Sequence, residues 1–406
     1  MKVGVPKETF PGETRVALVP ALVASLKKAG VETIVEAGAG QAAGYPDADY
    51  KAAGAEIEAD RSAVLAADVV LQVRCAGASD EASREDLQRL TAGQTVIAFA
   101  DPLGQPETAA QWAARGVTLI SMELIPRITR AQSMDALSSM AMVAGYKAVL
   151  LAAVELPKMF PLMMTAAGTV TPARVFVVGA GVAGLQAIAT ARRLGAVVEA
   201  YDVRPVVKEE VESLGGKFLE LELATDDASA KGGYARQFDE DFYRRQREMM
   251  TVAVAEQDVV ITTAAIPGRK APILVTREMV EGMRPGSVIL DLAADRGGNC
   301  ELTTPGETVV HNGVSIMGPS NLPALAPYHS SQMYAKNITT LLLHLLEDGQ
   351  LSLERDDEII RETVVATNGQ VVHPRVRELL KLEPLAGGDD SDETPAANEK
   401  GKAGET

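Results

Sequence analysis

The chain has 406 residues, of which 47% are hydrophobic and 23% are charged, a composition typical of a globular protein with room for two domains. The net charge of −16 argues against a nucleic-acid partner, which would require clustered Lys and Arg. Cys75 and Cys300 provide neither a disulfide framework nor metal-ligand spacing, and they suit a reducing cytoplasm. We expect no metal, no signal peptide and no membrane span, because the longest apolar run, 148–156, is shorter than the ~18 residues required.

Apolar, β-branched runs alternate with amphipathic segments through the first third of the chain. The runs predict strands, and the segments between them predict helices. The predicted strands are 31–36, 68–73, 94–99 and 117–121, and the predicted helices are 20–29, 84–90 and 107–115. This alternation predicts a mostly parallel α/β sheet. A long helix rich in Ala, Leu and Met is then predicted at 135–154.

A β-branched run at 175–178 leads directly into Gly-Ala-Gly-Val-Ala-Gly, which a predicted helix follows. This order is typical of a dinucleotide-binding turn. Gly179 permits the tight turn, Gly181 lets the backbone approach a pyrophosphate, and Gly184 allows the helix to pack closely on the strand. Val182 lies at the start of the helix, where free N–H groups and the helix dipole favour phosphate. The alternative is a βαβ turn that binds no ligand.

The next predicted strand, 197–201, ends at Asp202, about 20 residues after the glycines. A carboxylate there accepts hydrogen bonds from the adenosine ribose and repels the 2′-phosphate of NADP, so NAD is favoured. We assign Val203 and Arg204 to the same adenosine end. Arg204 complicates the preference, because an arginine at this place accommodates a 2′-phosphate. Its alternatives are a stacking partner for adenine and a solvated surface charge.

The region after this strand repeats the βα pattern. Its predicted strands are 258–263 and 287–292, and its predicted helices are 277–283 and 331–346. Ala264 and Ala265 follow the end of a predicted strand, where open α/β sheets bind ligands. Their small side chains either leave room for a ribose or fill the core.

The most economical architecture is α/β, with two Rossmann-like doubly wound domains and a cleft between them. The first domain comprises 1–137 and 328–380, the second comprises 138–327, and a disordered acidic tail occupies 381–406. Two segments depart from the pattern. The polar stretch 224–247 predicts an irregular lid or a disordered loop. The apolar, Met-rich stretch 158–164 predicts either a subunit contact, such as an exchanged hairpin, or an ordinary core strand.

Three blocks, 13–20, 178–186 and 291–300, resemble the alanine dehydrogenase and nicotinamide nucleotide transhydrogenase superfamily. Within it, 121–139 resembles the Arg-Gln-Asp loop of the proton-translocating transhydrogenase, and 232–235 resembles that family's mobile loop over bound nucleotide. The resemblance implies a soluble NAD(H)-binding alpha subunit. Such a subunit exchanges hydride with NADP(H) on a beta subunit, and the transfer is coupled to proton translocation through a membrane-spanning subunit.

The same resemblance implies a homodimer in the cytoplasm, peripheral on the cytoplasmic face of the inner membrane through its partners. It also implies that Arg127, Gln132 and Asp135 fix the nicotinamide ring, its carboxamide and its ribose, since orientation supplies much of the rate of hydride transfer. The alternative for Asp135 is a charge at a helix N-terminus. The remaining implied site residues are Ser133, Met134 and Ser138 in the same loop and Gly233 and Tyr234 in the mobile loop.

Alanine dehydrogenase is the second interpretation, and several residues depart from it. That enzyme uses an Arg, a Lys, a His and an Asp. Arg15 and Asp295 match two of them, but the Lys position is Arg74, and no His lies near Asp101. Arginine cannot act as a general base at neutral pH, and a site without His lacks the usual acid and base. Direct hydride transfer needs neither group. The third interpretation, from a different class, is a non-catalytic NAD(H)-binding module.

Overall fold

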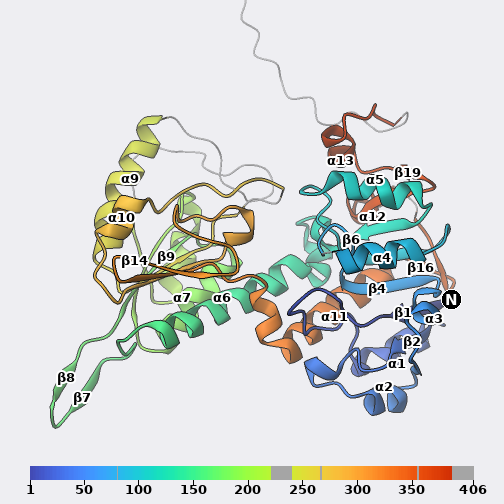
Figure 1. Ribbon diagram of the computed structural model, residues 1–406, viewed down its shortest axis with the longest axis horizontal. Coiled ribbons are helices and arrows are strands. Elements are labelled where there is room, and N and C mark those ends of the chain that lie inside the picture. The colour runs from blue at the N-terminus through green and yellow to red at the C-terminus, as the bar shows by residue number, and fades with distance from the viewer. Residues whose placement is uncertain (80, 221–239, 266–267, 354–355, 386–406) are drawn as a thin grey trace, which may run out of the picture.

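The computed structural model describes residues 1–79, 81–220, 240–265, 268–353 and 356–385. Gly233, Tyr234 and most of the predicted acidic tail lie outside these residues. Two separate sheets, each flanked by helices, lie side by side and form two α/β domains (Figure 1). The predicted fold class is therefore confirmed.

The first sheet is a doubly wound sheet with two antiparallel additions. Its strands, in spatial order, are β19 (Gln370–Val371), β18 (Val364–Thr367), β6 (Thr118–Ser121), β5 (Thr95–Phe99), β4 (Val69–Arg74), β1 (Lys2–Val5), β2 (Glu32–Glu36) and β3 (Glu56–Glu58). β1 to β6 are parallel in the order 3-2-1-4-5-6, whereas β18 pairs antiparallel with β6 and β19 pairs antiparallel with β18. Its helices are α1 (Pro20–Lys28), α2 (Asp47–Ala53), α3 (Arg61–Leu65), α4 (Glu81–Arg89), α5 (Pro106–Ala114), α12 (Glu358–Thr363) and α13 (Pro374–Leu379).

The second sheet repeats this topology. Its strands, in spatial order, are β11 (Lys217–Phe218), β10 (Val197–Tyr201), β9 (Arg174–Val178), β12 (Val259–Thr262), β13 (Val288–Asp291), β15 (Val314–Met317) and β14 (Thr308–His311), of which only β14 is antiparallel. Its helices are α7 (Val182–Arg193), α8 (Lys208–Ser213), α9 (Glu240–Ala255) and α10 (Arg277–Glu281). Successive residues of β9 enter opposite cores: Val177 packs with Ile188 of α7, and Phe176 packs with Val254 of α9. A parallel strand buried on both faces explains the continuous apolar run in the sequence.

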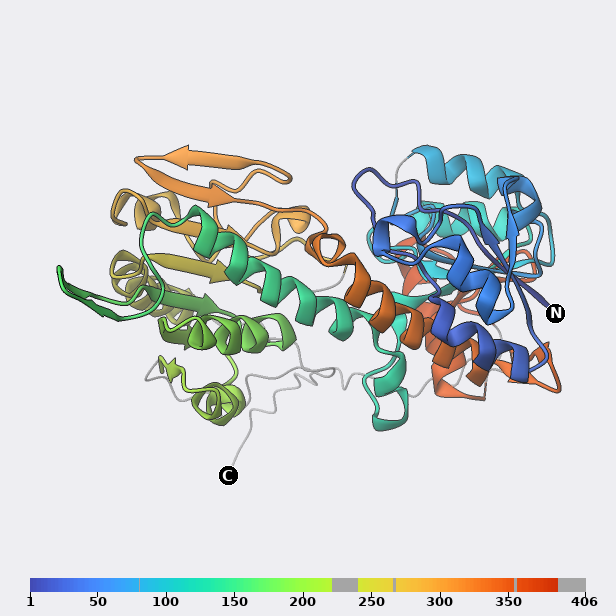
Figure 2. The same ribbon diagram turned by 90° about the horizontal axis from the view of Figure 1, so that it is seen from below.

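Two long helices, α6 (Ala136–Glu155) and α11 (Pro327–His344), join the two domains and pack against each other (Figure 2). The chain passes into the second domain along α6 and returns along α11. The predicted domain boundaries, 137/138 and 327/328, fall at the first turns of these helices. We retain those boundaries as a proposal.

Two expectations need correction. Residues 240–247, expected to be irregular, form the start of α9, which buries Met250 and Val254 later in the same helix. Within the described residues one helix, α6, is long and apolar enough to cross a membrane, with a mean hydropathy of 1.6, so the expectation that no segment reaches that length is wrong. α6 nevertheless packs against α7 and α11, as a core helix does.

A hairpin follows α6, formed by β7 (Met163–Thr165) and β8 (Gly168–Val170), and it projects away from the second domain (Figure 1). All three residues of β7 are exposed. The alternative interpretation of this segment as a core strand is therefore wrong.

Candidate nucleotide-binding site

The glycine motif lies where the strand order of the second sheet reverses. β9 and β12 are neighbours there, although β10 and β11 separate them in sequence. The motif leaves the carboxyl end of β9, and Ala264 leaves the carboxyl end of β12. Ligands of doubly wound sheets bind in the crevice at such a reversal. The two predicted parts of the site therefore meet at one edge of the sheet.

The three motif glycines have different surroundings in the structure. Gly179 has a φ of +101°, a conformation that side chains disfavour. A Cβ on Gly184 would lie 1.8 Å from the carbonyl oxygen of Gly179, so only glycine fits between helix and strand. A Cβ on Gly181 would meet no protein atom within 4 Å. The backbone at Gly181 is therefore open to a ligand.

α7 begins directly after this open backbone. Its N-cap, Gly181, supplies no side-chain hydrogen bond, and Val182 at the first position is exposed. The first N–H groups of a helix have no partner within the helix and carry the positive end of its dipole. The start of α7 therefore presents open backbone and free N–H groups, which is the kind of site that binds phosphate groups.

Asp202, at the end of β10, already accepts four hydrogen bonds. Its carboxylate receives the N–H of Ala180 (2.8 Å) and three donors of Arg204: the backbone N–H (2.9 Å), Nε (3.0 Å) and Nη2 (3.1 Å). Its side chain is only 8% exposed. The hydrogen bond to Asp202 raises the pKa of the Arg204 guanidinium. Val203 is half-buried and packs against the core that contains Tyr201.

The Arg-Gln-Asp segment forms a 3-10 turn, η3 (Thr129–Met134), at the start of α6. Arg127, Gln132 and Ser133 are exposed, whereas Met134 is 4% exposed and belongs to the core of the first domain. Asp135 caps α6: it accepts the N–H of Ser138 (2.8 Å) and its hydroxyl (2.6 Å). The alternative given above for Asp135, a carboxylate at a helix N-terminus, therefore describes its contacts in this structure.

α6 connects this turn to the glycine motif. A Cβ on Gly145 would lie 2.1 Å from the carbonyl oxygen of Ala183, so α6 packs tightly against the first turn of α7 at Gly145. Asp135 precedes Gly145 by ten residues, which is about 15 Å along a helix. One helix thus fixes the separation between the two predicted ends of the site.

At the end of β12, Ala264 is half-buried and Ala265 is exposed. Asn299 holds the backbone of Ala264 on both sides: Oδ1 accepts the Ala264 N–H (3.0 Å), and Nδ2 donates to the Ala264 carbonyl (2.8 Å). Asn299 is fully buried, and its own N–H donates to Asp291 (2.7 Å). Sequence reasoning missed this role, although Asn299 lies inside the third family-like block.

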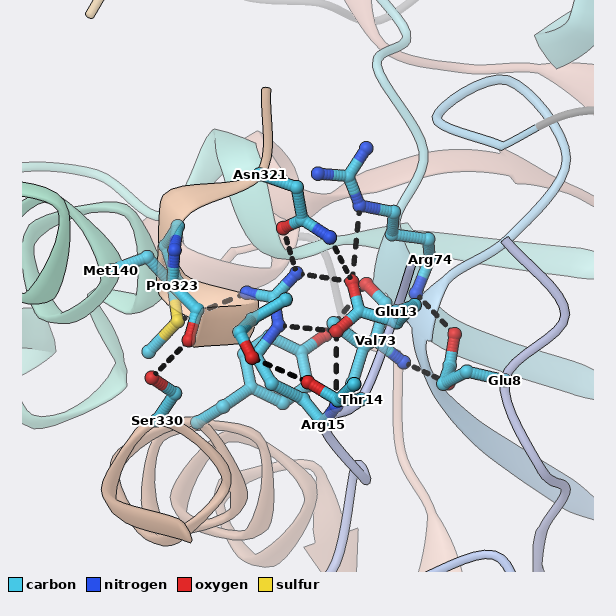
Figure 3. Close-up of polar contacts among 12 residues, drawn as sticks. Glu8, Glu13, Thr14, Arg15, Val73, Arg74, Met140, Asn321, Pro323 and Ser330 are labelled. Atoms are coloured by element: carbon cyan, nitrogen blue, oxygen red, sulfur yellow. Dashed lines mark hydrogen bonds and ion pairs between the residues drawn. The ribbon is translucent and has the colours of Figure 1, made fainter. Parts of the chain in front are cut away.

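The reversal point of the first sheet, between β1 and β4, is filled by charged side chains instead (Figure 3). The Glu8 carboxylate accepts the N–H groups of Val73 (2.6 Å) and Arg74 (3.1 Å). Desolvation by the surrounding protein, together with the charge of Glu13, raises the pKa of Glu8 to about 8.

The buried side chain of Arg15 lies in the same group of charged side chains and is held by Glu13 and Asn321. Its Nε and Nη2 donate to the two oxygens of Glu13 at 2.7 and 2.5 Å, and Nη2 also donates to Asn321 at 3.0 Å (Figure 3). Arg74 Nε lies 3.4 Å from Glu13. Sequence reasoning identified Arg15 and Arg74 but not Glu13 or Asn321, since Asn321 is 308 residues from Glu13 in the chain.

The remaining positions compared with alanine dehydrogenase are also paired. Asp101 forms an ion pair with Arg296 of the second domain (2.6 Å), and Asp295 accepts the hydroxyl of Ser320 (2.6 Å). The histidines lie elsewhere: His311 beside Glu281, His344 beside Asp357, His373 beside Glu362 and His329 beside Tyr328. The cluster around Arg15 therefore contains no histidine among the residues that the structure describes.

Comparisons with known proteins identify relatives over nearly the whole chain. Residues 4–144 match the family model "Alanine dehydrogenase/PNT, N-terminal domain", and residues 148–374 match "Alanine dehydrogenase/PNT, C-terminal domain". An NAD(P) transhydrogenase alpha-subunit protein of Rhodospirillum rubrum is 46% identical over 378 residues, covering 92% of this chain and 98% of that protein. The alanine dehydrogenase of Bacillus subtilis is 31% identical over 392 residues, covering 94% and 96%. The solved transhydrogenase of Sinorhizobium meliloti has a TM-score of 0.80 at 44% identity, covering 92% and 99%.

Proposed function

Because the chain belongs to the alanine dehydrogenase/PNT family, we propose that it is the NAD(H)-binding subunit of an NAD(P) transhydrogenase. Hydride then passes directly between NAD(H) on this chain and NADP(H) on a partner subunit. The observation that carries the proposal is the contrast between the two sheet reversals. The one beside Gly181 presents open backbone, whereas the one beside Glu13 is filled by ion pairs. Transhydrogenation requires only a nucleotide site on this chain. An amino-acid dehydrogenase requires a nucleotide site and, in addition, a site for its keto-acid substrate.

In this proposal each part of the site has one task. The N–H groups of α7 bind the pyrophosphate, and Gly181 lets it approach. Asp202 binds the adenosine ribose and disfavours a 2′-phosphate, so NAD(H) is the cofactor of this chain. Arg127, Gln132 and Asp135 orient the nicotinamide end, with Ser138 holding the Asp135 carboxylate. The bound nicotinamide supplies the hydride, and the protein supplies alignment.

We also propose that two copies of the chain associate through the hairpin and the uncovered face of α6. Val154, near the end of α6, is 86% exposed, and Met164 in the hairpin is 82% exposed. Leu162, Tyr146 and Met142 extend the apolar surface along the same segment. Exposed apolar side chains gathered over one region are typical of an interface. Proton translocation and attachment to the cytoplasmic face of the inner membrane then belong to a membrane-spanning partner subunit.

The test is to mix the purified chain with its NADP(H)-binding partner and to follow hydride transfer from NADH to an NADP analogue. We expect transfer only when both proteins are present. NADH oxidation by the chain alone with pyruvate and ammonia would instead support the dehydrogenase. NADH binding without transfer in the mixture would support the non-catalytic module.

A further inference from the structure

The exposed side chain of Gln132 makes no hydrogen bond among the described residues, although its neighbours in η3 are firmly held. Ala131 and Met134, on either side of the Gln132–Ser133 pair, are buried in the core of the first domain. The position of the Gln132 amide is therefore set by its backbone. What fixes that backbone decides where the amide points.

One fixing contact comes from α11. Asn337 is 6% exposed, and its Nδ2 donates to the carbonyl of Ser133 at 2.9 Å. Its Oδ1 is buried and accepts no hydrogen bond within the described part of the chain. Burying an unpaired amide oxygen is costly, so a hydrophobic residue of similar size would suit helix packing at least as well. The bond to Ser133 is what an asparagine provides here.

The second contact comes from α12. Arg130 donates from both terminal nitrogens to Asp357, at 3.0 and 2.7 Å. Asp357 also caps α12 through the N–H of Ile359 (2.8 Å) and lies 2.8 Å from Nε2 of His344 at the end of α11. The Arg130 guanidinium holds the pKa of Asp357 well below its ordinary range. A planar fork on a carboxylate fixes direction as well as distance.

We propose that Asn337 and Arg130 are positioning residues that hold η3 and thereby aim Gln132 at the nicotinamide end of the site. Arg130 fixes the turn two residues before Gln132, and Asn337 fixes it one residue after. The inference rests on the proposed function. A shift of about 1 Å in an orienting group costs on the order of a hundredfold in rate, so loosening either contact lowers transfer more than binding.

The variants are Asn337→Leu and Arg130→Gln, each with a matched control. Thr339→Val lies on the same helix, is equally buried, and removes a hydroxyl that has no partner among the described residues. Arg361→Gln removes an exposed arginine from α12 whose ion-pair partner, Glu362, lies on the same helix. Arg130→Lys keeps the charge but loses the planar fork. Transfer is measured with the NADP(H)-binding partner, and NADH affinity by titration of the chain alone.

We expect Asn337→Leu and Arg130→Gln to lower turnover by about tenfold or more, with the NADH dissociation constant changed by less than about twofold. Arg130→Lys should recover part of the loss, and both controls should match the wild type. Combined with Gln132→Asn, neither variant should lower turnover further, because both act through Gln132. The inference would be overturned if a positioning variant lowered the turnover of Gln132→Asn by the same factor by which it lowers that of the wild type. It would also be overturned if turnover and NADH affinity fell equally.

Two results separate this inference from the function on which it rests. If the wild type transfers hydride and Gln132→Asn is slow, but both positioning variants are normal, only the inference is wrong. If the wild type transfers none, the proposed function and the inference both fall. If Asn337→Leu does not fold, Arg130→Gln tests the inference by itself. The Arg130 side chain is half exposed, so its loss leaves the core intact.

Discussion

The Asp202 carboxylate and the Arg204 guanidinium form an ion pair, with Nε of Arg204 3.0 Å from Oδ1 of Asp202, at the end of β10. Together with the N–H groups of Ala180 and Arg204, this pair occupies the roughly four lone-pair positions of a carboxylate. In the proposed complex with NAD(H), a ribose hydroxyl would gain access to Asp202 by displacing a donor of Arg204. Arg204 would then compete with the ribose of NAD(H), and it would offer a partner to the 2′-phosphate of NADP(H).

Substitutions of the two partners should consequently move nucleotide selectivity in opposite directions. Asp202→Asn should weaken NADH binding by about 1–3 kcal/mol and narrow the difference between NADH and NADPH. Arg204→Ala should widen that difference, because it leaves the carboxylate charge uncompensated. The difference in affinity is measured by titrating each variant with NADH and with NADPH. Glu209→Gln, on the exposed face of α8, is the control. Parallel changes in the two variants would refute the competition.

Alanine substitutions at two glycines of the motif should separate binding from stability. Gly181→Ala adds a methyl group in open space, so the free energy of unfolding should change by less than about 0.5 kcal/mol while NADH affinity falls. Gly184→Ala forces a methyl group against the Gly179 carbonyl and should destabilise the fold by about 1–3 kcal/mol. Thermal unfolding and NADH titration of both variants check this. If Gly181→Ala bound NADH normally, the proposed position of the pyrophosphate beside Gly181 would be wrong.

Glu8 should make stability depend on pH. Its pKa is raised from 4.5 to about 8 in the folded chain, so between these values the native state holds a proton that the unfolded state has released. The contribution is fully present below about pH 4.5 and is lost as the pH rises through about 8. Glu8→Gln stays neutral, so its urea stability should fall less than that of the wild type between pH 5 and pH 8. Identical pH profiles would show that Glu8 is ionised throughout.

The hairpin should determine the oligomeric state. Met164→Asp places a charge on the most exposed apolar residue of β7, and desolvating that charge in an interface is costly. We expect the dimer to dissociate to monomers in light scattering after gel filtration. Val310→Asp, on the exposed edge strand β14, serves as the control and should leave the dimer intact. A dimer that survives Met164→Asp would place the contact elsewhere.

Sequence patterns predict those elements whose signal is local. The predicted strand 197–201 matches β10 to the residue, because β-branched and aromatic side chains end abruptly at Asp202. α9 escapes prediction because its first half is charged, and the apolar residues that the structure shows on its buried face, Met250, Ala253 and Val254, all lie in its second half. The cluster around Arg15 is only partly predictable. Glu13 lies two residues from Arg15 in the chain, but Asn321 lies 306 residues from it, so no local sequence pattern predicts the contact between Arg15 and Asn321.

α6 links the position of the η3 turn to that of the second domain. It is a rod of 20 residues, about 30 Å long, that begins at the Asp135 cap, touches α7 at Gly145 near its midpoint, and ends beside the exposed Val154. The half of α6 after Gly145 packs in the core of the second domain through Ala148, Val149 and Ala152, whereas its N-terminal part packs in the core of the first domain through Ala136 and Met140. A bend of about 4° at Gly145 would displace Asp135 by about 1 Å relative to α7, since the arm is about 15 Å long. A slight bend of this one helix would therefore move the turn that carries Gln132 relative to the glycine motif.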